Sequence, residues 1–216
     1  MKTAKKIVVL LPVIVISIVY AVLRHQQFQH AGHKRLAVLV FSMLLFYIWV
    51  GAGVFRRRQE GGADILVQSS FYVFVFSVLT LTGYFIFFNQ VSAHGWWQRL
   101  MGRIHSGYGI NLNALDFMNR RNKLTYDVVG NSFMLFPLGI YLPLLYRRLN
   151  NFFKVVIAAL LVSMAIELMQ LATNFRVTDI NDVILNTAGA AAGFIVFWLL
   201  RLLFVKPKQP LQQQLG

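Results

Sequence analysis

The chain has 216 residues, of which 57% are hydrophobic and only 13% are charged. A water-soluble domain of this length could neither bury so much apolar surface nor cover itself with so few charges, so the bilayer must be part of its solvent. The formal net charge of +14 is distributed in short clusters beside apolar runs, which argues against a nucleic-acid partner. The absence of cysteine excludes disulfides, thiolate metal sites and a cysteine nucleophile.

Six apolar runs are long enough to cross a membrane, for which a helix needs about 20 residues. In chain order the predicted spans are residues 7–23, 36–55, 65–88, 128–146, 152–175 and 180–204. The sequence therefore predicts an all-α, polytopic bundle of about six transmembrane helices. We divide it into three N-terminal spans (1-90), a loop (91-126), a core of three spans (127-205) and a polar tail (206-216).

The basic residues predict how the chain is oriented. Twelve of the 21 Lys and Arg residues lie on the side of the two termini, and nine lie on the other side. The positive-inside rule therefore favours cytoplasmic termini. Lys2, Lys5 and Lys6 before the first span also fit a cleaved signal peptide, but we expect this span to remain as a membrane helix.

The loop between the third and fourth spans contains an amphipathic segment. It consists of Trp96 and Trp97 followed by Arg99, Leu100, Met101, Arg103 and Ile104. Such a pattern indicates a helix that lies in the outer interface and anchors the protein there. A lid over a site and a contact for lipid headgroups are the alternative roles.

Three predicted spans carry polar stripes toward the same, outer side of the membrane. The members are Asp127 and Asn131 in the fourth span, Glu167, Gln170 and Asn174 in the fifth, and Asp182 and Asn186 in the sixth. The turn between the last two spans adds Arg176, Asp179 and Asn181. Each stripe follows helical spacing, so each lies on one face of its helix. We expect them to converge.

Glu167 is the member that most needs an explanation. A regular helix would place it about 13 Å below Arg176, inside the hydrocarbon, where a charge costs about 2.5 to 3.5 kcal/mol. Arg176 and the amides of Asn131, Gln170 and Asn186 are candidate partners, and a protonated Glu167 is the alternative. Polar groups can simply join helices, at about 1 kcal/mol each, but their number favours a ligand or substrate site.

We predict no cofactor and no zinc site, because the histidines lie in loops without a third ligand in register. Glu167, Asp179 and Asp182 could together hold a hard cation such as Mg²⁺, and this stays a hypothesis. The chain contains neither a G-x-S-x-G elbow nor a phosphate-binding G-x-x-x-x-G-K-[ST] loop.

Small residues indicate where helix backbones approach each other. Gly189-x-x-x-Gly193 in the sixth span is flanked by alanines, and we expect it to pack within the chain on the fourth or fifth span and not to mediate dimerisation. Pro137 and Gly139 predict a kink in the fourth span.

Together these residues resemble the signature of the VanZ-like family. The pattern is Glu167-x-x-Gln170-x5-Arg176-x-x-Asp179-x-x-Asp182-x3-Asn186-x-x-Gly189-x3-Gly193, preceded by Asn131-x5-Pro137-x-Gly139. The segment 110–117 is similar to a family segment that usually reads N-L-x-P-F, although here Ala114 and Leu115 stand in place of the proline.

The resemblance implies a link to teicoplanin and lipoglycopeptide resistance, without defining a reaction. The leading hypothesis is a multi-pass protein of the bacterial plasma membrane whose outward-facing site binds an envelope lipid, a lipid-linked wall precursor or the lipoglycopeptide. Arg176 would bind an anionic headgroup. Asp179 and Asp182 would orient the arginine or hold a cation, and Glu167 would accept or donate a proton. Two alternatives remain. One is an intramembrane hydrolase or transferase that acts on a lipid-linked phosphate or sugar, with Glu167 as catalytic acid or base. The other is a small transporter or flippase. The sequence leaves the oligomeric state undetermined.

Overall fold

The computed structural model describes residues 2–25, 33–57, 61–91, 94–115, 124–173 and 177–204. These are almost entirely helical, and six helical segments are long and apolar enough to cross a membrane. The predicted all-α class and the number of spans are confirmed. The chain is therefore a multi-pass membrane protein.

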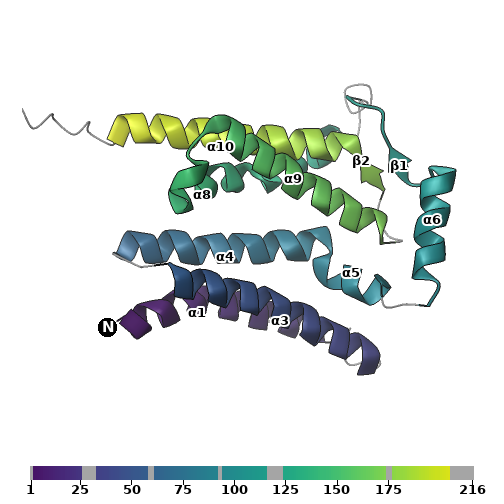
Figure 1. Ribbon diagram of the computed structural model, residues 1–216, viewed down its shortest axis with the longest axis horizontal. Coiled ribbons are helices and arrows are strands. Elements are labelled where there is room, and N and C mark those ends of the chain that lie inside the picture. Colours follow the sequence, from purple (N-terminus) through teal and green to yellow (C-terminus); the bar gives the residue numbers. More distant parts are fainter. Residues whose placement is uncertain are drawn as a thin grey trace, which may run out of the picture.

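The N-terminal half consists of α1 (Lys2–Leu23), α3 (His33–Arg56), α4 (Gly62–Thr82) and the short α5 (Tyr84–Val91). These helices form the lower part of the molecule in Figure 1. Aromatic rings fill the space between them: the centroid of Phe76 on α4 lies 5.9 Å from Tyr20 on α1 and 5.5 Å from Phe46 on α3. Burial of large rings of this kind stabilises the contact between the helices through dispersion and area burial.

The C-terminal half consists of α7 (Leu124–Met134), α8 (Phe136–Leu145), the 3-10 turn η2 (Arg147–Leu149), α9 (Phe152–Leu171) and α10 (Ile180–Phe204). Helix α10 packs against α7, α8 and α9. The two halves meet where α4 contacts α8, and Tyr141 of α8 lies 5.6 Å, between ring centroids, from both Phe71 and Phe74 of α4.

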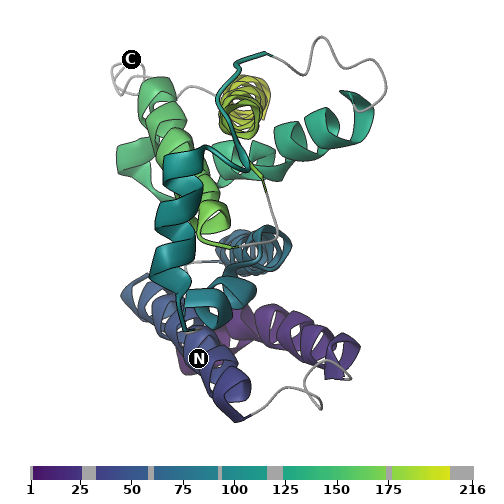
Figure 2. The same ribbon diagram turned by 90° about the vertical axis from the view of Figure 1, so that its right-hand side faces the viewer.

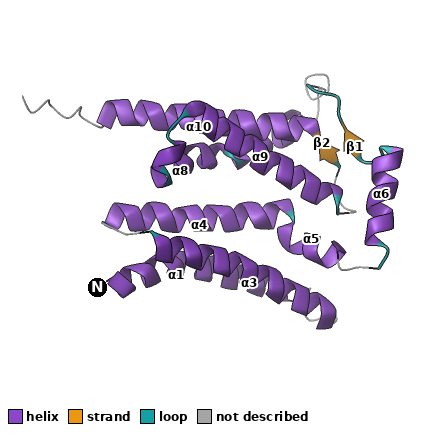
Figure 3. Ribbon diagram, viewed as in Figure 1, coloured by secondary structure: helices purple, strands orange, loops and turns teal. Residues whose placement is uncertain are grey.

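A helix and a small sheet cover one end of the bundle. Helix α6 (Trp96–Ser106) crosses that end from the N-terminal toward the C-terminal helices (Figure 2). Beside it, β1 (Ile110–Asn111) and β2 (Thr178–Asp179) form a two-stranded parallel ladder (Figure 3). We call this the α6 end. The start of α1 and the end of α10 both lie at the opposite end (Figure 1), which we call the terminal end.

Two predicted spans are interrupted in the structure. The third, expected as one helix over 65–88, ends at Thr82 because Gly83 adopts the left-handed conformation (φ 84°) and its N–H caps the carbonyls of Leu79 and Thr80. The fourth is broken at Leu135, two residues before Pro137, whose missing N–H cannot continue the helical hydrogen bonds. The kink expected from Pro137 and Gly139 is thus a full break between α7 and α8.

The fifth span is shorter than predicted. Helix α9 ends at Leu171, where Ala172 is the C-cap and the Thr173 hydroxyl donates to the carbonyl of Gln170. The prediction had continued this helix to residue 175. Residues 174–176, including Asn174 and Arg176, lie outside the described part of the chain.

Candidate functional site

Polar side chains from three helices gather at the α6 end. Helix α7 contributes Asn131, α9 contributes Ser163, Glu167 and Gln170, and α10 contributes Asp182 and Asn186; we call these six residues the polar cluster. The exposed fractions of Glu167 and Gln170 are 4%, and those of Ser163 and Asn186 are 0%. On both α9 and α10 the buried face carries polar residues toward the α6 end and mainly apolar or small residues farther along. The buried polar residues of the two helices therefore lie at the same end of the bundle.

The carboxylate of Glu167 is held by the strand that precedes α10. The backbone N–H of Asp179 donates to Glu167 Oε2 at 2.9 Å, and the Thr178 hydroxyl donates to the Glu167 carbonyl at 3.3 Å. Because α9 ends at Leu171, Glu167 lies one helical turn from the helix end, about 6 Å along the axis. Glu167 is thus buried in protein near one end of the bundle, and its distance from Arg176 lies outside the described residues.

Two hydrogen bonds join the helices inside the cluster. Asn131 Nδ2 on α7 donates to Asp182 Oδ1 on α10, and Asn186 Nδ2 on α10 donates to Ser163 Oγ on α9 at 2.9 Å. Within the described residues, Asn186 Oδ1 and Thr187 Oγ1 are buried without a hydrogen-bond partner. Buried polar atoms are nearly always paired, so an unpaired acceptor at this place offers a hydrogen-bonding position to a ligand.

Asp179 links the chain segments on either side of α10's start by hydrogen bonds. As the N-cap of α10, its Oδ1 accepts from Asn181 N at 2.9 Å and Asn181 Nδ2 at 2.7 Å, while its Oδ2 accepts from Asn111 Nδ2 at 2.9 Å. Asn181 also binds the chain after β1, through Leu115 N at 2.6 Å and the Asn113 carbonyl at 3.0 Å. With three donors on its carboxylate, Asp179 holds β1 and the start of α10 together.

Helix α6 is fastened to the end of α9. Arg103 Nη1 donates to the carbonyl of Leu171 at 2.8 Å and to that of Thr173, and Trp96 Nε1 donates to the carbonyl of Ala172 at 3.1 Å. The last carbonyls of a helix lack partners within it and carry partial negative charge, so a guanidinium is a favourable cap. These bonds join the amphipathic segment to the end of α9, next to the cluster, while its role as an interfacial anchor or a lid stays a prediction.

The three carboxylates do not converge on one point. Glu167 accepts from a backbone N–H, Asp179 from Asn111 and Asn181, and Asp182 from Asn131. Among the described residues no group of three or more His, Asp or Glu side chains has the geometry of a metal site. The hard-cation hypothesis therefore gains no support from the arrangement. The cluster offers acceptors and amides at separate positions, which suits recognition of a ligand with several polar groups.

Small residues bring α10 against the broken fourth span. A Cβ on Gly189 would lie 1.8 Å from the Ser132 carbonyl oxygen, and one on Gly193 would lie 2.0 Å from that of Phe136. At Gly139 a Cβ would lie 2.0 Å from the Ala190 carbonyl oxygen. The glycine face of α10 thus contacts α7 and α8 of its own chain, and this close approach brings Asn131 within hydrogen-bonding distance of Asp182.

Several contributors to the site were not among the candidates predicted from the sequence. Ser163 is four residues before Glu167 on the same face of α9, so helical spacing could have identified it. Asn111 stands in the segment similar to N-L-x-P-F, which was the only signal for it. The contacts of Arg103 and Trp96 with α9 had no signal, because a loop of unknown path separates them.

The fold and the span composition define this chain as a multi-pass helical membrane protein with a polar cluster between its last three spans. The chain belongs to the VanZ/LLP1 family, whose model matches residues 74–201. The match begins within α4 and so includes α6, β1 and the whole polar cluster. No curated protein and no solved structure matches the chain.

Proposed function

We propose that this VanZ-like protein of the bacterial plasma membrane binds an envelope lipid or a lipid-linked wall precursor at the polar cluster and so lowers susceptibility to teicoplanin or lipoglycopeptides. The observation that carries this proposal is the burial of Glu167 beside polar groups from α7, α9 and α10 at one end of the bundle. Polar groups between membrane helices are costly unless they pair or meet a ligand, and this cluster holds more of them than helix contact requires.

The chemistry of the cluster supports a ligand with both hydroxyl or amide groups and an anionic headgroup. Glu167 and the unpaired Asn186 Oδ1 are acceptors, which would receive donors from a sugar or peptide portion. Arg176, between α9 and β2 in the chain, would receive a phosphate, to which guanidinium groups bind in bidentate geometry. The positive-inside rule favours an outer location for the α6 end, where wall precursors and glycopeptides are present.

Antibiotic susceptibility of a sensitive host tests this proposal. Cells would express the wild-type chain, Glu167→Gln, or the control Leu199→Ala, whose side chain is 46% exposed on α10. Membrane levels would be matched by immunoblot. We expect the wild type and Leu199→Ala to raise the teicoplanin concentration needed to stop growth, and Glu167→Gln to lose the effect. Equal protection by Glu167→Gln, or none by the wild type, would contradict the proposal.

A further inference from the structure

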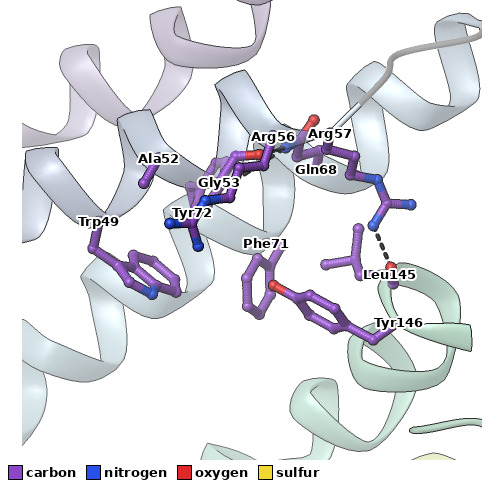
Figure 4. Close-up of a pocket in the computed structure, with 10 residues that line it drawn as sticks. All are labelled: Trp49, Ala52, Gly53, Arg56, Arg57, Gln68, Phe71, Tyr72, Leu145 and Tyr146. Atoms are coloured by element: carbon purple, nitrogen blue, oxygen red, sulfur yellow. Dashed lines mark hydrogen bonds between the residues drawn. The ribbon is translucent and has the colours of Figure 1, made fainter. Parts of the chain in front are cut away.

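A cavity lies at the terminal end, at the opposite end of the bundle from Glu167. Its volume is about 390 Å³, and it is formed by the end of α3, the first half of α4 and the end of α8 (Figure 4). The lining residues are Trp49, Ala52, Gly53, Arg56, Arg57, Gln68, Phe71, Tyr72, Leu145 and Tyr146. No residue of the polar cluster is among them, so this is a separate site.

The charged residues that line the cavity in the described part of the chain are basic. They are Arg56 and Arg57, and none of the described lining residues carries a carboxylate. Arg57 Nη1 donates to the Leu145 carbonyl, which positions its guanidinium at the junction of the two halves (Figure 4). Among the described residues the Arg56 side chain has no hydrogen-bond partner, and it lines the cavity, so its guanidinium donors are available to a ligand.

The polar wall of the cavity is fixed by buried groups. Gln68 and Tyr72 are 2% and 3% exposed, and Gln68 Nε2 donates to Tyr72 Oη at 3.2 Å and to the Gly53 carbonyl at 3.4 Å. Because Tyr72 Oη accepts this bond, its own proton remains to be donated. A Cβ at Gly53 would lie 2.3 Å from Tyr72 Oη. The hydroxyl fits against α3 because residue 53 has no side chain.

An apolar wall continues from the guanidiniums toward the middle of the membrane. Trp49 lies two turns before Arg56 on α3, and its ring centroid is 6.1 Å from that of Phe71 and 5.6 Å from that of Tyr72. Trp49 is 45% exposed, so the ring also borders the surface that faces lipid. The site thus combines cationic donors at one membrane surface with aromatic contacts below them.

We propose that this cavity binds the phosphate headgroup of an anionic glycerophospholipid, with the acyl chains passing along Trp49. Arg56 and Arg57 meet the phosphate, Tyr72 donates to it, and the aromatic wall contacts the start of the acyl chains. Basic pockets between membrane helices bind anionic headgroups in this way. Since Arg57 also bonds to the end of α8, the bound lipid joins α3 and α4 to α8. By the positive-inside rule it comes from the cytoplasmic leaflet.

Thermal stability of the full chain in a zwitterionic detergent tests the proposal. We expect phosphatidylglycerol to raise Tm, because a ligand that binds only the folded state stabilises that state. We expect phosphatidylcholine and inorganic phosphate to leave Tm unchanged. Arg56→Gln should reduce the shift while keeping the bond from Arg57 to Leu145, and Arg56→Gln with Arg57→Gln should abolish it. The matched control is Arg147→Gln with Arg148→Gln, exposed arginines at the same end that do not line the cavity.

Each result decides the proposal. An equal shift in the Arg56/Arg57 double variant, or an equal loss in the Arg147/Arg148 control, would show that phosphatidylglycerol acts through general surface charge. An equal shift with inorganic phosphate would identify free phosphate as the ligand. If the Arg56/Arg57 variant does not fold, native mass spectrometry of Arg56→Gln decides: retained phosphatidylglycerol equal to wild type would overturn the assignment. Glu167→Gln should keep the full shift, which separates this site from the polar cluster.

Discussion

The side chain of Glu167, one turn before the end of α9, accepts a hydrogen bond of 2.9 Å from the backbone N–H of Asp179, the residue that caps α10. One contact therefore ties the buried carboxylate to the turn between two membrane spans. Since the same Asp179 bonds to Asn111 beyond α6, the carboxylate, the turn and the covering segment form one connected structure.

Asn131 and Asp182 should stabilise the folded protein together. Replacing Asn131 by Ala removes the donor to the Asp182 carboxylate, and a bond to a charged group contributes about 1.5 to 3 kcal/mol in soluble proteins and less between membrane helices. A double-mutant cycle of Asn131→Ala and Asp182→Ala, read by unfolding in detergent, should give a coupling energy of about 1 kcal/mol. Val129→Ala, at an exposed position on α7, is the control. Additive losses would contradict the contact.

Gly189 should not tolerate even a methyl group. A Cβ would lie 1.8 Å from the Ser132 carbonyl oxygen, and backbone cannot move aside as a flexible side chain can. Gly189→Ala should lower the free energy of unfolding by about 1 to 3 kcal/mol or more, as overpacking does. The adjacent exposed Ala188→Leu should have little effect. Size-exclusion chromatography with thermal challenge would measure both, and equal stability of the two variants would refute the close approach of α10 to α7.

Arg103 should control the order of the α9 end. Arg103→Gln removes the guanidinium that bonds to the carbonyls of Leu171 and Thr173, so amide exchange in the α9 end should rise. Arg99→Gln is a matched control, because among the described residues the Arg99 side chain donates to the carbonyl of His94, just before its own helix, and not to α9. Hydrogen exchange read by mass spectrometry would compare them. Faster exchange in both variants, or in neither, would argue against fastening of α6 to α9.

The orientation can be tested with cysteine labelling, since the chain has no natural cysteine. Leu112→Cys introduces a thiol at a position that is 74% exposed near the α6 end, and Arg147→Cys introduces one at the terminal end. A membrane-impermeant maleimide should label Leu112→Cys in intact cells and Arg147→Cys only after permeabilisation. The reverse pattern would place the polar cluster on the cytoplasmic side.

Periodicity and composition determined most of the fold. The six apolar runs were found because a bilayer demands about 20 apolar residues per helix, and the stripe around Glu167 followed from helical spacing. The break at Gly83 could not be predicted, because a glycine inside an apolar run is compatible with a continuous helix until tertiary packing selects the left-handed conformation. The end of α9 at Leu171 depends on Arg103 and Trp96, which lie 68 or more residues away in the chain.

The cavity at the terminal end shows a similar limit to prediction from the sequence. In the sequence, Arg56 and Arg57 indicate only orientation, and Gln68 and Tyr72 belong to a span that is otherwise apolar. Their common site exists because α3, α4 and α8 meet at one end of the bundle, and helical spacing within one element carries no information about contacts between elements.

The most direct test of the central claim is lipid analysis of the purified protein from a host that makes wall precursors. Wild type, Glu167→Gln and the lipid-facing control Leu168→Ala, 63% exposed on the adjacent position of α9, would be isolated in parallel and their bound lipids identified by mass spectrometry. We predict that the wild type and Leu168→Ala retain an envelope lipid or lipid-linked precursor that Glu167→Gln loses. Identical lipid content in all three proteins would contradict the claim that the polar cluster is a ligand site.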